Sequence, residues 1–316
     1  MIALVAVAQE VSLMGRMLSY DRLRSILVAT VTHLPDQRTG PHRIYELADA
    51  ALGAFAVFFT QAPSFLAYQR DLQRRTGRNN AQSLLGLDQV PTDPQIRNLL
   101  DPIAPEHLAA PFWRVFEQLQ QGDYLKSYQG WLGRWLLAFD GTQYFHSTEI
   151  HCPQCTTRVL NERTHYAHAL VAPLIVAPGH SQVIALEPAF IMPQDGHEKQ
   201  DCELRATERW LQRNAQRFPA GAVTVLGDDL YAHQPFCELL LTYRWHFAFT
   251  CKPESHTALY QEIELLAKVG GVQQCSERHH NGARREVLAI PLRHARAPAG
   301  GRETAVRQLV RGHHHR

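Results

Sequence analysis

Between residues 131 and 250, five β-type segments alternate with two helical ones, and this order restricts the fold more than any other feature of the chain. The run AVTVL at 222–226 is apolar and short, as expected of a central strand buried on both faces. The turn sequence APGHS at 177–181 joins two strand-like segments into a hairpin. The order strand, hairpin, helix, strand, helix, strand predicts a mixed α/β sheet covered on both faces. We expect strands at 134–145, 166–176, 182–191, 222–226 and 245–250, and helices at 198–218 and 235–243.

The preceding part of the chain has helical spacing instead of strand alternation. Segments 45–61, 64–75 and 110–121 are expected to be helices. A proline-rich passage at 91–105 separates them and predicts short turns. We therefore divide the chain into a helical region at 1–130, an α/β core at 131–292, and a basic tail at 293–316.

The charge balance excludes a globally basic nucleic-acid-binding protein. The 316 residues carry a formal net charge of only +2, so a nucleic-acid surface has to be a local patch. Almost all the positive charge is arginine, whose forked side chain suits phosphate contacts. Codon preference in a GC-rich genome is the alternative explanation. The candidate patch lies in QRDLQRRTGR, where an ordinary solvated helix face is the alternative, and contains Arg70, Arg74, Arg75 and Arg78.

The apolar start of the chain, MIALVAVAQEVSLMG, lacks a basic beginning and is interrupted by Gln9 and Glu10. It is too short to span a bilayer, and no other run approaches that length. Six cysteines in a chain of this size do not indicate a disulfide scaffold. We expect a cytoplasmic protein with reduced cysteines and no membrane partner.

Two aspartates follow apolar strands and are the first candidates for chemistry. Asp140 follows LLAF, and Asp228 follows AVTVLG. Carboxylates at the ends of two buried strands are oxygen ligands of the kind that suit Mg²⁺. Two such ions can clamp the attacking and leaving oxygens of a phosphoryl displacement. Capping of a turn is the alternative role for each aspartate taken alone.

Several longer motifs carry a resemblance to a known family. LLAFDGTQYFHS, IHCPQC, PQDGHEKQDCE and LGDDLYAHQPFCELL resemble the catalytic core of insertion-sequence DDE transposases, which have a ribonuclease H-like fold. FFTQAPSFLAYQR, NNAQSLLG and PTDPQIRNLLD resemble the helical N-terminal part of one bacterial subgroup. The resemblance extends over residues 20 to 290. It implies a ribonuclease H-like mixed sheet preceded by an all-α region, and metal-dependent cleavage and strand transfer of transposon-end DNA.

The resemblance also assigns roles to individual residues. Asp140 and Asp228 fall where the family has its first two catalytic acids, and would hold Mg²⁺ or Mn²⁺. Asp229 is adjacent and could exchange roles, but Tyr231, three residues after Asp228, fits the family pattern. Lys252 would contact backbone phosphate, or is simply a solvated loop lysine. DNA is the implied partner, and a homodimer is compatible with the resemblance.

The third acid of the family has no counterpart that we identify from the sequence. Glu254, Glu262, Glu264 and Glu286 follow Asp228 but lack the expected context. The tail at 293–316 holds six arginines, four histidines and one acid, Glu303, and resembles an out-of-frame translation or a natural basic tail. The prediction is therefore a C-terminally truncated transposase that is inactive as this chain. The alternatives are a non-catalytic DNA-binding remnant or regulator, and a metal-dependent nuclease with the same core.

A second set of candidate ligands lies after the first strand. Cys152 and Cys155 form a CxxC pair, and His165 and His168 follow. Two thiolates and two imidazoles could make a tetrahedral Zn²⁺ site, with nearby His146 and His151 as substitutes. The alternative is a reduced CxxC pair packed in the connection between two strands.

Overall fold

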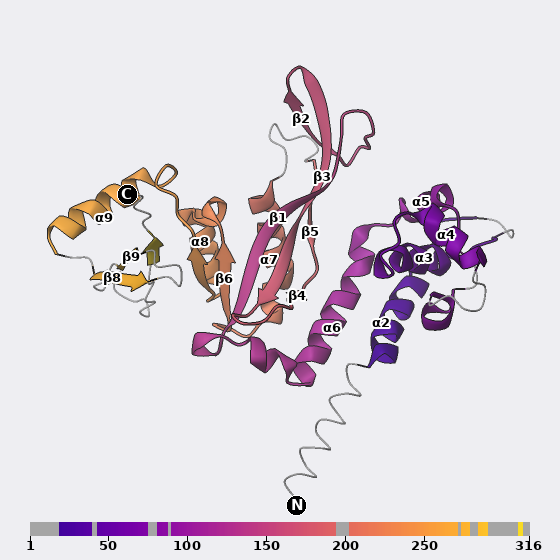
Figure 1. The fold of residues 1–316 in the computed structure, drawn as a ribbon, viewed down its shortest axis with the longest axis horizontal. Coiled ribbons are helices and arrows are strands. Elements are labelled where there is room, and N and C mark those ends of the chain that lie inside the picture. The colour runs from indigo at the N-terminus through magenta and orange to yellow at the C-terminus, as the bar shows by residue number, and fades with distance from the viewer. Residues whose placement is uncertain are drawn as a thin grey trace, which may run out of the picture. The chain divides into compact units, whose positions relative to one another are not determined.

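The computed structural model describes residues 19–39, 43–74, 81–87, 90–193, 202–270, 273–278, 284–289 and 309–311. The chain divides into two compact units, Met1–Lys126 and Ser127–Arg316, which are described separately. Figure 1 shows the helices of the first unit and the sheet of the second. Within the described ranges, none of the helices is long and apolar enough to cross a membrane.

The first unit is helical in its described part. The apolar segment expected at 45–61 forms helix α3, which begins after a capping box made by Glu46 and Asp49. Proline residues open the later turns, where the missing N–H costs nothing. The helices are α2 (Tyr20–Thr32), α3 (Leu47–Phe59), α4 (Phe65–Arg74), α5 (Asp93–Leu100) and α6 (Ala109–Gln121), with a π-helical turn at Ala81–Leu85 and a 3-10 turn at Pro105–Leu108.

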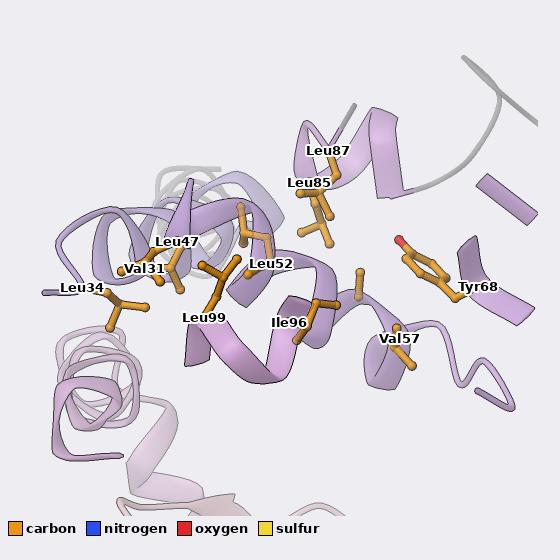
Figure 2. Close-up of a cluster of buried hydrophobic side chains, with 12 residues drawn as sticks. Val31, Leu34, Leu47, Leu52, Val57, Tyr68, Leu85, Leu87, Ile96 and Leu99 are labelled. Carbon is orange, nitrogen blue, oxygen red and sulfur yellow. The ribbon is translucent and has the colours of Figure 1, made fainter. Parts of the chain in front are cut away.

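An apolar core holds helices α2 to α5 together. Ala50 and Ala56 of α3 are fully buried, and Leu52 and Val57 on the same helix are nearly so. Leu52 and Val57 belong to one buried cluster with Ile96 and Leu99 of α5 and Tyr68 of α4 (Figure 2). Burial of each large aliphatic side chain is worth about 1.5–3 kcal/mol, so this cluster accounts for the association of short helices that would be marginal alone.

The second unit is built on a mixed sheet of seven described strands. Its main path runs in the order β2-β3-β1-β6-β7, and β4 and β5 both pair with β3. Strand β1 is antiparallel to β3 and parallel to β6, and β6 is parallel to β7. The strands are β1 (Trp135–Ser147), β2 (Thr156–Leu160), β3 (Arg163–Val176), β4 (Ile184–Ala185), β5 (Ala189–Ile191), β6 (Val223–Gly227) and β7 (His246–Phe249). The expected mixed α/β sheet is confirmed.

Two details of the sheet differ from the expectation. The segment expected as one strand at 182–191 is two short strands, because the chain leaves the ladder between Ala185 and Ala189. Strand β2 was not expected at all, since its sequence TTRVL is short and largely exposed. It pairs with β3 only near the tip of a long ribbon, which extends beyond the part of β1 that pairs with β6 (Figure 1).

Two helices connect the strands. Helix α7 (Glu203–Asn214) occupies the described part of the helix expected at 198–218, and residues 198–201 lie outside the described residues. Helix α8 (Gln234–Thr242) begins with proline in its first turn, as expected. The fully buried Trp210 of α7 contacts Phe139 of β1, with ring centroids 5.3 Å apart, and its indole N–H donates to the Glu187 carbonyl. This aromatic contact fixes α7 against β1.

Further along the chain, helix α9 (Thr257–Lys268) precedes a separate three-stranded sheet. That sheet has the order β10-β9-β8, formed by β8 (Gln273–Arg278), β9 (Arg284–Ala289) and β10 (Leu309–Arg311). Strand β10 belongs to the basic tail at 293–316, for which no strand or helix is expected from the sequence. The rest of 293–316, including Glu303, lies outside the described residues.

Candidate functional site

Asp140 lies on β1, and Asp228 directly follows β6, the parallel strand beside it. The ladder between β1 and β6 pairs Ala138 with Leu226, so continuing it by two residues on each strand brings Asp140 level with Asp228. Both residues are exposed, whereas Phe139 beside Asp140 is buried. Two exposed carboxylates therefore lie where the carboxyl end of β6 runs beside the middle of β1. Because Asp140 is exposed, its carboxylate does not lose its contact with water on folding.

Asp228 and Asp229 have different surroundings. One carboxylate oxygen of Asp228 accepts the Leu230 N–H at 3.0 Å and caps a 3-10 turn. Asp229 accepts the Lys252 N–H at 2.6 Å and lies 3.1 Å from Nε2 of His256. Burial raises the pKa of Asp229, but the hydrogen bonds from Ser255 and Lys252 outweigh it, so the pKa lies below its ordinary value. Asp229 therefore anchors the loop after β7.

Glu203 is a third carboxylate at this position, and the sequence analysis did not identify it. It is the first residue of α7, where a negative charge is favoured by the helix dipole. Burial raises the pKa of the Glu203 carboxyl above its ordinary value, and the charges of Asp140 and Asp228 raise it further. The three acids therefore form one electrostatic cluster contributed by β1, β6 and α7.

Gly141 makes the approach of Glu203 possible. Side chains alternate along a strand, so residue 141 projects to the face that carries Phe139 and helix α7. A Cβ atom at this position would overlap with the Glu203 carboxylate. Because glycine has no side chain, Glu203 lies against the backbone of β1, next to Asp140.

A buried tyrosine lies behind the three acids. Tyr231 is almost fully buried, and its hydroxyl lies 3.3 Å from Oγ1 of Thr207, which donates to the Glu203 carbonyl. Burial raises the pKa of Tyr231 well above its usual range, and the charges of Glu203, Asp228 and Asp140 add to the effect. Tyr231 is therefore neutral, and it positions the first turn of α7 rather than supplying a charge.

A cavity of about 620 Å³ lies beside Glu203. Ile191, Cys202, Glu203 and Leu230 contribute to its lining, and the ribbon formed by β1, β2 and β3 contributes the other residues, including Arg158. In that ribbon, Nε2 of His146 lies 2.8 Å from Nδ1 of His165, so one nitrogen of the pair carries the shared proton. A substrate that reaches the acids would meet imidazole and guanidinium groups on the ribbon.

A second cluster lies in the same ribbon. Sγ of Cys152 lies 3.8 Å from Sγ of Cys155, and Nε2 of His168 lies 3.3 and 3.4 Å from the two sulfurs. Over the described part of the chain, these are the only three His, Cys, Asp or Glu side chains whose ligand atoms all lie within 4.8 Å of one another. The three carboxylates are spaced more widely, which suits two ions about 3.5–4 Å apart better than one.

His165 does not join the cysteines. Residues three apart on one strand point to opposite faces, so β3 directs His165 and His168 to different sides. His165 contacts His146 instead, with stacked rings. The pattern CxxC…HxxH treated the two histidines as equivalent because the strand expected at 166–176 began after His165, whereas β3 begins at Arg163.

The predicted nucleic-acid contacts are only partly within the described residues. Arg70 is exposed on α4, and Arg74 is the last residue of that helix. Arg75 and Arg78 lie outside the described residues. Lys252 is exposed, and its backbone N–H bond to Asp229 holds it in the segment next to the acid cluster.

Comparison with solved structures finds seven chains that match this one in fold. No protein-family model matches the chain, and no curated protein matches it. The chain is similar in structure to a piggyBac transposase in a synaptic complex with hairpin DNA, with a TM-score of 0.37 and 14% sequence identity. The similarity extends over 91% of this chain and 62% of the piggyBac chain.

Proposed function

We propose that this chain is a metal-dependent DNA transposase of the DDE type. The observation that carries the proposal is the convergence of Asp140, Asp228 and Glu203 from β1, β6 and α7. Burial and the charges of Asp140 and Asp228 oppose ionisation of Glu203, and the repulsion among the three carboxylates favours the binding of cations. Mg²⁺ or Mn²⁺, held by oxygen ligands, would relieve that repulsion.

The strand order supports a ribonuclease H-like core. An antiparallel pair, β1 and β3, is followed by two strands parallel to β1, with α7 and α8 as connections. The acids lie where β1 runs beside the carboxyl end of β6. In open α/β sheets, ligands bind outside the carboxyl ends of the strands, so the position of the acids agrees with a catalytic role.

The residues present fit a two-ion site. When bound, the metal ions would lower the pKa of a water molecule and neutralise charge on the scissile phosphate. Asp140, Asp228 and Glu203 would hold the ions through their carboxylate oxygens. In the proposed reaction, the oxygen of a water molecule would attack phosphorus while the P–O3′ bond breaks. The freed 3′-hydroxyl would then attack a phosphodiester of the target DNA, forming a new P–O bond as the target's own P–O3′ bond breaks and releases a 3′-hydroxyl.

Glu203 changes the expectation about activity. The sequence analysis predicted an inactive chain because no third acid followed Asp228. Glu203 precedes Asp228 in the sequence and supplies a carboxylate from α7, so that reason for inactivity no longer holds. We therefore propose that the chain cleaves DNA.

DNA is the proposed substrate, and the helical unit is the proposed site of additional contacts. Each arginine that neutralises a phosphate contributes about −0.9 to the slope of log affinity against log salt concentration. Replacing Arg70, Arg74, Arg75 and Arg78 together by alanine should flatten that slope, measured by fluorescence anisotropy. Replacement of Arg97, which pairs with Asp93, serves as the control.

The test of function is a cleavage assay on a plasmid carrying the genomic DNA that flanks the coding sequence. With Mg²⁺ or Mn²⁺, the wild-type chain should nick this DNA and join the ends, and Asp140→Asn should abolish both steps. Cleavage without joining would favour the nuclease alternative. Binding without any metal-dependent cleavage would overturn the proposal in favour of a DNA-binding remnant.

A further inference from the structure

The ribbon formed by β1, β2 and β3 contains a cluster of soft ligands that the proposed cleavage chemistry does not use. We propose that Cys152, Cys155 and His168 bind one Zn²⁺ ion, which fixes the tip of the ribbon. The proposal does not depend on the acid cluster, because none of its ligands is a carboxylate.

The interatomic distances match zinc geometry. A tetrahedral ion with Zn–S bonds of about 2.3 Å and Zn–N bonds of about 2.0–2.1 Å separates two sulfurs by about 3.8 Å, and sulfur from nitrogen by about 3.5 Å. The separation of the two sulfurs is 3.8 Å, and those from sulfur to Nε2 are 3.3 and 3.4 Å. A disulfide requires about 2.05 Å between the sulfurs, so the pair is placed for a shared ion and not for a bond.

The backbone around the cysteines is shaped for chelation. The Cys155 N–H donates to the Cys152 carbonyl at 3.1 Å, closing a tight turn. The Cys152 N–H lies 3.4 Å from Sγ of Cys155 and directs its partial positive charge at that sulfur. Burial raises the pKa of the Cys155 thiol above its ordinary value, and this N–H opposes that rise. The turn therefore presents both sulfurs toward one point.

His168 reaches this point from β3 because strand β1 is irregular opposite it. The pairing of β1 with β3 shifts between Gln143 and Phe145, leaving Tyr144 as an extra residue. The Tyr144 ring stacks on the His168 imidazole at 5.8 Å, and Phe145 lies against it at 5.5 Å. These two rings hold the imidazole with Nε2 directed at the sulfurs.

A water molecule would complete a tetrahedral shell, because the described residues offer three ligands. Among the residues that the structure describes, no other His, Cys, Asp or Glu ligand atom lies within 4.8 Å of all three members. His151, next to Cys152, has its ring stacked on Tyr166 instead. A bound ion would join the loop before β2 to strand β3 and so resist separation of the strands at the tip.

The experiment measures zinc in the purified full-length chain by mass spectrometry, alongside a set of variants. The wild type should carry about one equivalent of Zn²⁺. Cys152→Ser and His168→Ala should reduce the content at least tenfold. His165→Ala, His151→Ala and Cys237→Ser should retain the wild-type content. Asp140→Asn should also retain zinc, which separates this site from the acid cluster and from the proposed function.

Reconstitution with Co²⁺ covers the case in which a variant fails to fold. Wild-type protein that is stripped by chelation and refilled with Co²⁺ should show a thiolate-to-metal charge-transfer band and the intense visible bands of tetrahedral coordination. Absence of these bands, or zinc content that is unchanged in Cys152→Ser, would overturn the proposal. Loss of zinc in His165→Ala with retention in His168→Ala would also overturn it, because the ligand set would then be wrong.

Discussion

The carboxylate cluster and the Cys–His cluster both belong to the second unit, but the chain assembles them in different ways. The carboxylates come from residues 140, 203 and 228, and only the sheet and α7 bring them together. The Cys–His cluster comes from residues 152–168, within one loop and one ribbon. The difference is between a site that requires the complete fold and a site that requires local structure alone.

The two clusters also differ in their electrostatics. The three acids raise the free energy of the metal-free protein, since burial and like charges oppose ionisation of Glu203. The Cys–His cluster contains no carboxylate. We therefore expect the acid cluster to be strained without cations, and the Cys–His cluster not to be.

The largest expected effect separates Asp228 from its neighbour. Asp228→Asn keeps an oxygen for the Leu230 N–H but removes a metal ligand, so metal-dependent DNA cleavage should fall about a hundredfold or more. Asp229→Asn should retain cleavage and unfold at a lower temperature, because Asp229 anchors Lys252 and His256. Cleavage rates and melting curves of the two variants decide this. Equal loss of cleavage without loss of stability would contradict the separate roles.

A smaller effect is expected from adding one methyl group. In Gly141→Ala the new Cβ would displace the Glu203 carboxylate, so Mn²⁺ affinity at the acids should fall about tenfold, at a cost of the order of 1.4 kcal/mol. Zinc content should stay unchanged. Gly130→Ala is the matched control, since its Cβ would meet nothing closer than 3.8 Å. Unchanged Mn²⁺ affinity in Gly141→Ala would show that Mn²⁺ binding does not require the Glu203 carboxylate to lie against residue 141.

The smallest effect concerns pH. The raised pKa of Glu203 means that the folded protein holds this proton to higher pH than the unfolded chain does. The contribution of Glu203 is therefore most favourable below its ordinary pKa, and it is lost as pH rises through the raised value. The melting temperature of the metal-free wild type, relative to Glu203→Gln, should fall as pH rises above the ordinary pKa of glutamate, which is about 4.3. Saturating Mg²⁺ should remove the fall, and an opposite slope would contradict the assignment.

The acids that local sequence marks could be predicted, and the acid that only the fold brings to the site could not. Asp140 and Asp228 follow apolar strand runs, so local pattern was enough to select them. Glu203 is separated from Asp140 by the whole ribbon and lies at a helix start whose neighbours are charged. The glutamates considered were those after Asp228, whereas the motif PQDGHEKQDCE ends at Glu203 itself. Glu203 could have been identified as an acid at the start of the helix that follows the hairpin, opposite the glycine that comes after Asp140.

The fold was predicted where periodicity is strong and missed where it is weak. Strands β1, β3, β6 and β7 and helix α8 begin and end within a few residues of the expected bounds. Strand β2 was missed because exposed edge strands carry little hydrophobic alternation. His165 was misassigned because β3 begins at Arg163, three residues before the expected start of the strand. His165 and His168 therefore lie on one strand and point to opposite faces.

The central claim is that Glu203 completes the metal site, and Mn²⁺ binding to zinc-loaded protein tests it most directly. Titration followed by electron paramagnetic resonance should give about two bound Mn²⁺ ions for the wild type. Glu208→Gln, which changes an acid on the same helix that pairs with Arg205, should behave like the wild type. Glu203→Gln should lose one ion or bind it at least tenfold more weakly. Two ions bound to Glu203→Gln with wild-type affinity would contradict the account.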